Sequence, residues 1–357
     1  MTENTAPTQV KCLVWDLDNT LWKGTLLEGD DPVPDTAVRD VIITLDSRGI
    51  LQAIASKNDH DHAWERLEQL GLAEYFVLPH INWGPKSRSV RQIADLLSFT
   101  HKTIAFVDDQ PAERAEVEYH LPEVRTYDAG RVLDLPDMPE FSPRVITVDA
   151  RKRRQMYRAG FERDRARENH SGPDEDFLRS LSLVLGIDRA GDEELSRVEE
   201  LTLRTSQMNA TGVHYSDATL RTLVDDPAHE VLTATLTDRF GPHGAVGMLL
   251  LERKPGVWHL KLLATSCRVV SFGTGTAILN WLVNQAALND VHMVADFRPT
   301  DRNRMMEIAY RFAGFTEEPC GCIDDILPTP EKDIQRLHLF AERRDPPTTF
   351  TIEALDL

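Results

Sequence analysis

The sequence predicts an α/β domain built on a parallel β-sheet, followed by a second domain of the α+β class. Three short apolar segments, at residues 12–15, 50–55 and 103–107, alternate with helical patterns in the first part of the chain. Each segment ends in polar residues, as expected of buried strands that deliver side chains to a sheet edge. Strands that alternate with helices form parallel sheets, whose ligands bind beyond the carboxyl ends of the strands. The three polar ends are therefore expected at one edge of the sheet.

The domain organisation follows from length and from a change of pattern. At 357 residues the chain exceeds the usual size of one domain. A Pro-rich stretch at residues 135–143 closes the α/β region. We expect a first domain over residues 1–145, a linker helix over 146–176 and a second domain over 177–357. The basic run at 151–167 is interpreted as a solvated linker helix or, alternatively, as a docking patch for an acidic partner.

The second domain mixes both element types. Helical patterns at 193–202 and 217–224 precede strand-like segments at 230–237, 245–252 and 257–264. A Gly-containing loop at 271–275 then opens a helix at 276–287, followed by a strand at 292–297 and a helix at 302–313. Separate helices and a meander of strands indicate an α+β domain, and the loop before the helix is suited to bind phosphate.

Composition excludes several classes of function. Hydrophobic residues make up 41% of the chain and charged residues 27%, values typical of globular proteins. A net charge of −18 argues against nucleic acid as a partner, because such binding relies on Lys and Arg. No apolar run reaches the roughly 20 residues that a membrane span requires, and no secretory signal is recognisable. With only four cysteines and no disulfide framework, we expect a cytoplasmic protein.

The first strand is followed by two carboxylates that suit phosphoryl transfer. Asp16 can attack phosphorus, while Asp18 can protonate the leaving oxygen and later activate water. An anionic nucleophile needs a metal to approach an anionic phosphate, and oxygen ligands of this kind suit Mg²⁺. Asp108, after the third strand, is the natural further ligand. Asp109 is expected to contribute directly or through water.

Further side chains complete this phosphate site. We expect Thr20, Ser56 and Asn58 to bind the phosphoryl group, and Lys86 to offset the charge that develops on it. A lone Asp-x-Asp pair is more often a loop or a helix cap. The order of the four motifs carries the prediction: a strand followed by Asp-x-Asp-x-Thr, a strand followed by Ser, then Lys, then a strand followed by Asp-Asp.

These motifs resemble those of the haloacid dehalogenase superfamily. The resemblance implies a Rossmannoid parallel sheet and a phosphoaspartyl intermediate on Asp16. It also implies that Asp16, the main-chain carbonyl of Asp18, and Asp108 hold the magnesium. Only about 31 residues separate Asp18 from the second strand, too few for a large cap domain. Another surface, such as the second domain, would then have to exclude water from the site.

A cysteine in the second domain is a candidate nucleophile. Cys267 follows an apolar strand, lies next to Arg268 and precedes the glycine loop and its helix. A neighbouring cation and a helix N-terminus both favour the reactive thiolate. The alternative is a small buried core cysteine. In the loop, Gly273 allows the close backbone approach that a pantetheine or a phosphate requires.

Over residues 11–340 the chain resembles the FkbH-like family, which joins a haloacid dehalogenase domain of subfamily IIIC to an acetyltransferase-like (GNAT-like) domain. The motifs that carry the resemblance are Leu21-Trp22-Lys23-Gly24, Trp83-Gly84-Pro85-Lys86-Ser87, Phe106-Val107-Asp108-Asp109-Gln110-Pro111-Ala112-Glu113-Arg114, Gln207-Met208-Asn209, Asp238-Arg239-Phe240-Gly241, Ser266-Cys267-Arg268-Val269 and Pro299-Thr300 with Asn303. The resemblance implies that D-1,3-bisphosphoglycerate is dephosphorylated and that its glyceryl unit passes through a Cys267 thioester to an acyl carrier protein. Such products feed polyketide biosynthesis.

One segment departs from the family pattern. Residues 271–275 read Ser-Phe-Gly-Thr-Gly and lack the arginine and glutamate that the family usually has there. Two other hypotheses therefore stay open. The chain is a stand-alone magnesium-dependent phosphatase with an acyl coenzyme A-dependent acyltransferase domain, or a non-catalytic scaffold that binds a carrier protein.

Two cysteines, a histidine and two tryptophans of the second domain are expected to have structural roles. Cys320 and Cys322 suggest a metal site, but no paired Cys or His motif completes it in the sequence, so we expect a surface turn. His259, on the strand before Cys267, is a possible base, although histidines on strands are more often structural. Trp258 and Trp281 are expected in the core.

Overall fold

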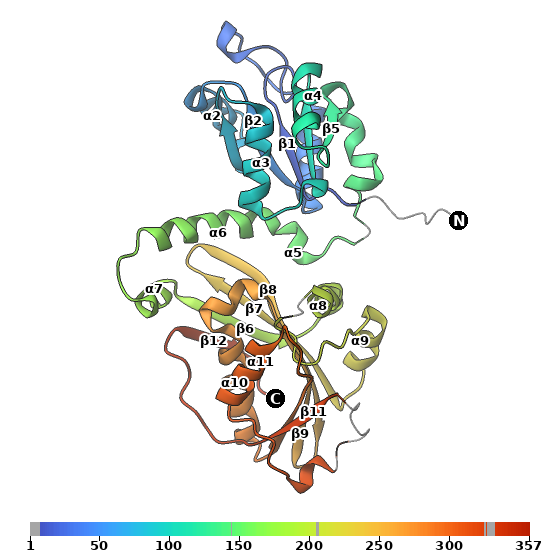
Figure 1. The fold of residues 1–357 in the computed structure, drawn as a ribbon, viewed down its shortest axis with the longest axis vertical. Coiled ribbons are helices and arrows are strands. Elements are labelled where there is room, and N and C mark those ends of the chain that lie inside the picture. The colour runs from blue at the N-terminus through green and yellow to red at the C-terminus, as the bar shows by residue number, and fades with distance from the viewer. Residues whose placement is uncertain (1–7, 144, 205–206, 325, 327–332) are drawn as a thin grey trace, which may run out of the picture. The chain divides into compact units, whose positions relative to one another are not determined.

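The computed structural model describes residues 8–143, 145–204, 207–324, 326 and 333–357. The chain divides into two compact units, Met1–Arg158 and Ala159–Leu357. The division falls inside helix α6 (Arg153–Glu168), within the segment expected to be a linker. Helices α5 (Val148–Arg151) and α7 (Asp174–Ser180) flank α6. Figure 1 shows the elements of each unit.

The first unit contains a five-stranded parallel sheet in the order β3-β2-β1-β4-β5. Its strands are β1 (Cys12–Trp15), β2 (Leu51–Ser56), β3 (Phe76–Ile81), β4 (Ile104–Asp108) and β5 (Arg125–Asp128). In the register of the sheet, Trp15 at the end of β1 lies beside Ile54 and Val107. The carboxyl ends of β1, β2 and β4 therefore share one edge, as the sequence predicts.

Helices cover both faces of this sheet. They are α1 (Thr36–Ser47), α2 (His60–Gln69), α3 (Lys86–Leu97) and α4 (Pro111–His120). Helix α3 packs beside α4 on one face (Figure 1), and α1 packs against the 3₁₀ segment η4 (Ala129–Asp137) on the other. The connection from β1 to β2 holds only the 3₁₀ turn η1 (Leu26–Glu28) and α1, so no large cap is inserted there.

The second unit contains a seven-stranded mixed sheet in the order β11-β10-β9-β8-β7-β6-β12. Its strands are β6 (Leu183–Arg189), β7 (His229–Asp238), β8 (Gly241–Lys254), β9 (Val257–Thr265), β10 (His292–Phe297), β11 (Gln335–Phe340) and β12 (Phe350–Ala354). Neighbours from β6 to β9 pair antiparallel, as do β10 and β11, whereas β9–β10 and β6–β12 pair parallel.

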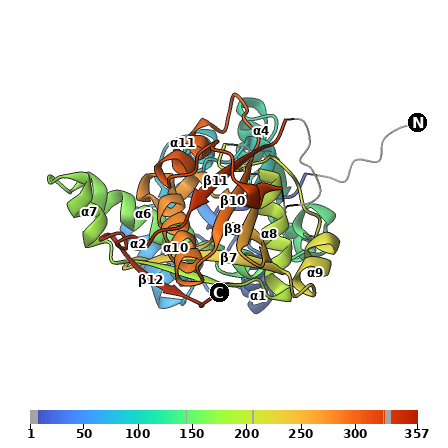
Figure 2. The ribbon, with the colours of Figure 1, turned by 90° about the horizontal axis from the view of Figure 1, so that it is seen from below.

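Alternate residues of the central strands enter two separate cores. Leu249 and Leu251 belong to the core that contains α10 (Thr274–Leu288) and α11 (Arg304–Phe312). Met248 and Leu250 belong to the core that contains α8 (Asp192–Arg204) and α9 (Asp217–Val224). Because strand side chains alternate between faces, α10 and α8 lie on opposite sides of the sheet (Figure 2). The predicted fold class, α/β followed by α+β, is confirmed.

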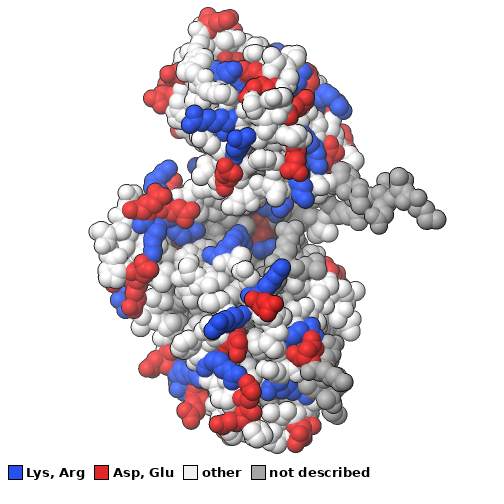
Figure 3. All heavy atoms as spheres, viewed as in Figure 1, with Lys and Arg blue, Asp and Glu red and all other residues white. Residues whose placement is uncertain are grey.

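The surface carries charges of both signs. On the face drawn in Figure 3, Lys and Arg side chains are interspersed with Asp and Glu over each unit. Among the described residues, no helix combines the length and apolar character that crossing a bilayer requires.

Candidate functional site

The shared strand edge of the first unit gathers a lysine and several carboxylates. Asp16 follows β1 directly, and its backbone N–H donates to the Val107 carbonyl of β4 at 3.0 Å. Lys86, at the first position of α3, donates to Asp16 Oδ1 and, at 3.0 Å, to Asp108 Oδ2. All three side chains are buried. A lysine at a helix N-terminus opposes the helix dipole, so this position is explained by the carboxylates around it.

The protonation equilibria of this cluster pull in opposite directions. Burial raises the pKa of Asp16, although the Lys86 ammonium and a hydrogen bond from Ser56 work against it. Burial and the nearby Asp16 raise the pKa of Asp108 to about 7. Burial alone would lower the pKa of Lys86, but its attraction to Asp16 and Asp108 outweighs burial and raises it. The charge of Lys86 therefore does not fully offset the cost of burying Asp16 and Asp108 in their ionised forms.

Glu113 of α4 is a member of this cluster that the sequence analysis did not single out. Its Oε2 lies 3.0 Å from Lys86 Nζ and its Oε1 lies 2.7 Å from Lys57 Nζ. Burial tends to raise the pKa of Glu113, but the contacts with Lys57 and Lys86 outweigh it and lower the pKa. Glu113 lies within the segment 106–114 that resembles the FkbH-like family, and this resemblance is the one feature of the sequence that could have identified Glu113 as a site residue.

Asp18 is fixed by three hydrogen bonds. Its Oδ1 accepts from Trp22 Nε1 at 2.8 Å and from the Leu26 N–H at 3.2 Å. Its Oδ2 accepts from Asn58 Nδ2 at 3.0 Å. The amide of Asn58, a predicted phosphate ligand, is thus directed at Asp18, and Asn58 orients that carboxylate.

Backbone and side-chain contacts join the ends of β1 and β4. The N–H of Asp109 donates to Thr20 Oγ1 at 2.9 Å, and the N–H of Gln110 donates to Asp108 Oδ1 at 2.8 Å. Arg114 donates to the Asp108 carbonyl at 2.7 Å. Thr20 is buried and holds the two loops together through this contact.

The same edge has a donor set that suits magnesium. One carboxylate oxygen each from Asp16, Asp108 and Asp109 lies within 4.8 Å of the other two. Asp109 Oδ1 is buried and has no hydrogen-bond partner among the described residues. Oxygen-only ligands and an unpaired buried carboxylate oxygen fit a hard divalent cation. The side chain of Asp18 is not part of this group, so only its main chain is left for the expected contribution.

Cys267 begins a 3₁₀ segment in the second unit, η6 (Cys267–Phe272), which is separated from the end of β9 by Ser266 alone. Its side chain is exposed, in contrast to the buried core cysteine of the alternative interpretation. Arg268 lies beside it, with Nε 3.4 Å from Ser266 Oγ. Gly273 ends η6 in the left-handed region (φ +78) and caps α10, and the space around its Cα is open.

A buried Asp–His–Arg group adjoins η6. Asp238 Oδ2 lies 3.1 Å from His243 Nε2 and also accepts from Arg163 Nε. Burial would raise the pKa of Asp238, but hydrogen bonds from His243 and Arg163 outweigh it and hold the pKa well below its usual range. Burial lowers the pKa of His243, so its imidazole is neutral at neutral pH. The His243 ring contacts Phe272 of η6 at 5.3 Å between centroids.

His259 is not suited to serve Cys267. It is buried, with Nε2 2.9 Å from Asp296 Oδ1 on the neighbouring strand β10. Six residues of strand, about 20 Å, separate it from the end of β9. Trp258 and Trp281 lie in the core, as predicted.

The structure thus collects the predicted side chains in two places. Those of the first unit lie together at the carboxyl ends of the strands: Asp16, Asp18, Thr20, Ser56, Asn58, Lys86, Asp108 and Asp109. Those of the second unit lie along η6: Cys267, Arg268 and Gly273.

Comparison with known proteins gives matches to each unit. Residues 24–116 match the family model of haloacid dehalogenase-like hydrolases, a range that contains Ser56, Lys86, Asp108 and Asp109. A solved structure of the N-terminal part of protein BF1531 from Bacteroides fragilis, which contains a phosphatase domain complexed with Mg, is 30% identical, with a TM-score of 0.33. The match covers 36% of this chain and 39% of that one.

The second set of similar structures consists of acetyltransferases. The ribosomal-protein-S18-alanine N-acetyltransferase from Escherichia coli is 14% identical, covering 45% of this chain and 97% of that one, with a TM-score of 0.34. Tetrahymena GCN5 is 13% identical, covering 46% of this chain and 99% of that one, with a TM-score of 0.34. No curated protein matches the chain. With the family match and the strand-edge geometry together, the first unit contains a haloacid dehalogenase-like hydrolase domain.

Proposed function

We propose that this chain is a magnesium-dependent glyceryltransferase/phosphatase. It takes D-1,3-bisphosphoglycerate, forms a thioester on Cys267, passes the acyl group to the phosphopantetheine thiol of an acyl carrier protein, and removes phosphate at Asp16. The observation that carries the hydrolytic half is the contact of one buried lysine with both Asp16 and Asp108.

The phosphatase step uses the strand-edge cluster. Asp16 attacks phosphorus, the bond from phosphorus to the leaving oxygen breaks, and Asp18 supplies the proton to that oxygen. Asp18 is held in place for this by Trp22 and Asn58. Water activated by Asp18 then hydrolyses the phosphoaspartate. Asp16, Asp108, Asp109 and the Asp18 carbonyl would hold magnesium, and the chemistry that the bound ion supplies is neutralisation of phosphoryl and carboxylate charge.

The acyl-transfer step uses η6. The Cys267 thiolate attacks the carbonyl carbon of the acyl phosphate, the carbon–oxygen bond to phosphate breaks, and inorganic phosphate leaves. The carrier's thiolate then attacks the thioester and releases Cys267. The exposed position of Cys267 supports access by a macromolecular thiol. His243, whose ring contacts Phe272 of η6, is the histidine we propose as proton acceptor for this step.

We infer a carrier protein that is acidic and a cytoplasmic location as part of this proposal. The basic run was one candidate for docking, but several of its arginines already have partners. Arg154 pairs with Asp46 at 3.0 Å, Arg163 pairs with Asp238, and Arg167 pairs with Asp174. The exposed Arg151 and Lys152 remain the better candidates for docking.

Intact-protein mass spectrometry tests both halves at once. The full chain is incubated with Mg²⁺ and D-1,3-bisphosphoglycerate, then with a candidate carrier, and both proteins are weighed. We expect a glyceryl increment on the wild type and no acyl adduct on Cys267→Ser, which still releases phosphate. Asp16→Asn, the reciprocal control, should keep an acyl adduct that retains phosphate if thioester formation comes first.

Other outcomes identify the remaining hypotheses. An adduct that persists in Cys267→Ser would overturn the role of Cys267. Acyl transfer only from acyl coenzyme A would indicate a phosphatase joined to an ordinary acyltransferase. That alternative is favoured by the open glycine loop at the N-terminus of α10, where backbone N–H groups are able to bind a phosphate. Carrier binding without turnover of any donor would indicate a scaffold.

A further inference from the structure

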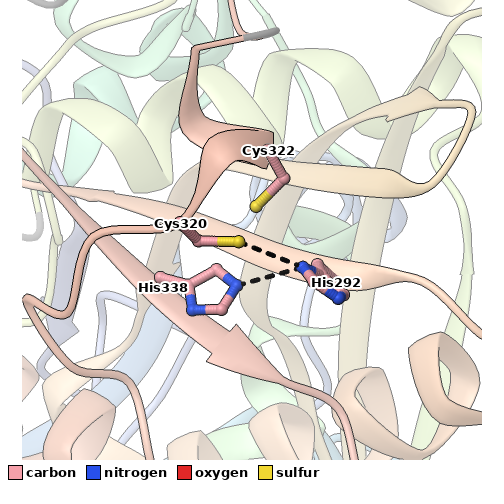
Figure 4. Close-up of side chains that lie close together, drawn as sticks. All are labelled: His292, Cys320, Cys322 and His338. Carbon is pink, nitrogen blue, oxygen red and sulfur yellow. Dashed lines mark hydrogen bonds between the residues drawn. The ribbon is translucent and has the colours of Figure 1, made fainter.

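Four potential metal ligands meet at the edge of the second unit's sheet. His292 begins β10, His338 lies in β11, and Cys320 and Cys322 flank Gly321 at the start of the 3₁₀ turn η7 (Gly321–Ile323). One ligand atom from each lies within 4.8 Å of the other three, and Figure 4 shows all four side chains directed toward one point. The turn expected at Cys320 and Cys322 is present as η7, with none of its residues buried, but the structure brings two histidines beside it that the sequence did not reveal.

Strand register places both histidines on one face. In the antiparallel β10–β11 pair, Val294 lies opposite His338 and His292 lies opposite Phe340. His292 and Val294 point to the same face because they are two residues apart on a strand. His338 is then the diagonal neighbour of His292, a position from which long side chains reach one another. The two histidines are 46 residues apart in sequence, which is why no local motif reveals them.

The cysteine segment is held against that face independently of any ion. Cys322 and Ile323 pack against a small buried cluster of Val257, Val294 and Ile326. Val257 pairs with His292 in the register of β9 and β10. The thiols therefore reach the imidazoles on a segment that apolar packing already positions, so little conformational entropy is lost when a metal binds.

The separations of the ligand atoms match a tetrahedron around zinc. His292 Nδ1 lies 3.5 Å from Cys320 Sγ and 3.3 Å from His338 Nε2. Zinc bonds of about 2.3 Å to sulfur and about 2.05 Å to nitrogen at tetrahedral angles imply edges of about 3.6 Å for N to S and about 3.3 Å for N to N. Two imidazole nitrogens that face each other beside a thiol are thus already spaced as ligands of one ion.

We propose that His292 Nδ1, His338 Nε2 and the thiolates of Cys320 and Cys322 bind one Zn²⁺ ion tetrahedrally. Two thiolates and two imidazoles are soft and borderline ligands, which select zinc and reject magnesium. Binding releases the two thiol protons to solvent. All four positions are filled by protein, so the ion is structural. It ties the segment that carries η7 to the edge strand β11 and to β10.

This site is separate from the strand-edge carboxylates and does not depend on the proposed function. The carboxylate group of the first unit offers oxygen ligands only, whereas this group offers sulfur and nitrogen. A spectroscopic signal that requires sulfur therefore reports this site alone, even when a second metal occupies the carboxylates.

Metal analysis of the full-length chain, purified with reductant, tests the proposal. We expect one equivalent of zinc per chain in the wild type and in Cys267→Ser, a matched control in which an exposed cysteine outside the cluster is changed. Cys320→Ser and Cys322→Ser should each lose that equivalent.

A cobalt titration keeps the test independent of how the variants fold. The wild type is depleted of metal with a chelator, reduced, and titrated with Co²⁺. We expect a thiolate-to-cobalt charge-transfer band and the strong visible bands of tetrahedral cobalt, saturating at one equivalent. Zn²⁺ should abolish these bands, because it binds such ligands more tightly than Co²⁺, whereas excess Mg²⁺ should not.

Two results would overturn the proposal. One is reduced wild-type protein that binds no zinc and gives no cobalt–thiolate band. The other is a disulfide between Cys320 and Cys322 in protein purified without reductant, detected by peptide mapping and by thiol counts in denaturant, if the protein still binds no zinc after the disulfide is reduced.

Discussion

Replacing Lys86 by Met tests how strongly the strand-edge cluster depends on its one buried cation. Lys86 Nζ lies 3.0 Å from both Asp108 Oδ2 and Glu113 Oε2 and also contacts Asp16. At an effective dielectric constant of about 20, one such contact corresponds to about 5 kcal/mol of attraction. Removal of the lysine also removes its desolvation penalty. Measured losses on breaking a buried pair are about 3–5 kcal/mol, and we expect the free energy of unfolding of the first unit to fall by this amount.

The assay is urea unfolding of the full-length chain at neutral pH, monitored by tryptophan fluorescence, with chelator present so that no metal replaces the charge of Lys86. The transition of the first unit is identified as the one that added Mg²⁺ shifts. Phosphate release from a small phosphomonoester should also fall by about 10²-fold or more, because Lys86 no longer offsets charge in the transition state.

Lys57→Met is the matched control. Lys57 makes the same kind of contact with the same partner, at 2.7 Å from Glu113, but its side chain is 42% exposed, against 3% for Lys86. An exposed ion pair contributes about 0–1 kcal/mol, so the control should lose little. Equal, small losses in both variants would refute the view that buried carboxylates depend on Lys86.

Three further substitutions test the surrounding structure. Asp238→Asn breaks the buried pair with Arg163 and should lower the free energy of unfolding of the second unit by about 3–5 kcal/mol. Because the pKa of Asp238 is lowered in the folded state, the wild type has this stability at neutral pH and loses it as the pH falls below about 4. Acid unfolding monitored by circular dichroism should show this loss in the wild type but not in the variant. Asn303→Ala removes a buried amide that contacts three or more backbone groups and should cost about 2–4 kcal/mol in urea unfolding, with an unchanged midpoint contradicting this. Gly49→Ala places a Cβ 2.7 Å from the Ala150 carbonyl oxygen at a φ of +76, so the variant should unfold at a lower temperature than the wild type. A thermal midpoint equal to that of the wild type would argue against this close approach.

Much of the fold could be predicted because its central strands are buried on both faces. Strands β1, β2 and β4 are short apolar runs that end in polar residues, and all their residues are buried. The edge strand β5 was missed because its four residues, Arg125–Asp128, are polar and none is buried. Strand β12 was missed for a similar reason, since every second residue of this edge strand is exposed. Strand β11 was also missed, although its three central residues are buried, because it begins with two polar residues and only a short apolar pattern remains.

The candidate site was predictable to the extent that its residues follow strands. Asp16 and Asp108 each come directly after or at the end of an apolar run, so the topology of a parallel sheet brings them to one edge. Glu113 could not be selected in this way. It is one of three glutamates in α4, and only the packing of that helix decides which of them reaches Lys86.

The sequence by itself determined the central strands β1, β2 and β4, several of the helices, and which ends of those strands carry acidic side chains. These features depend on local periods of two and 3.6 residues, which neighbouring residues set. The tertiary structure alone decided that Lys86 serves three carboxylates and that His292 and His338 meet Cys320 and Cys322. Those contacts depend on strand register and helix packing between residues distant in the chain, and a shift of one residue in register would turn His338 to the opposite face.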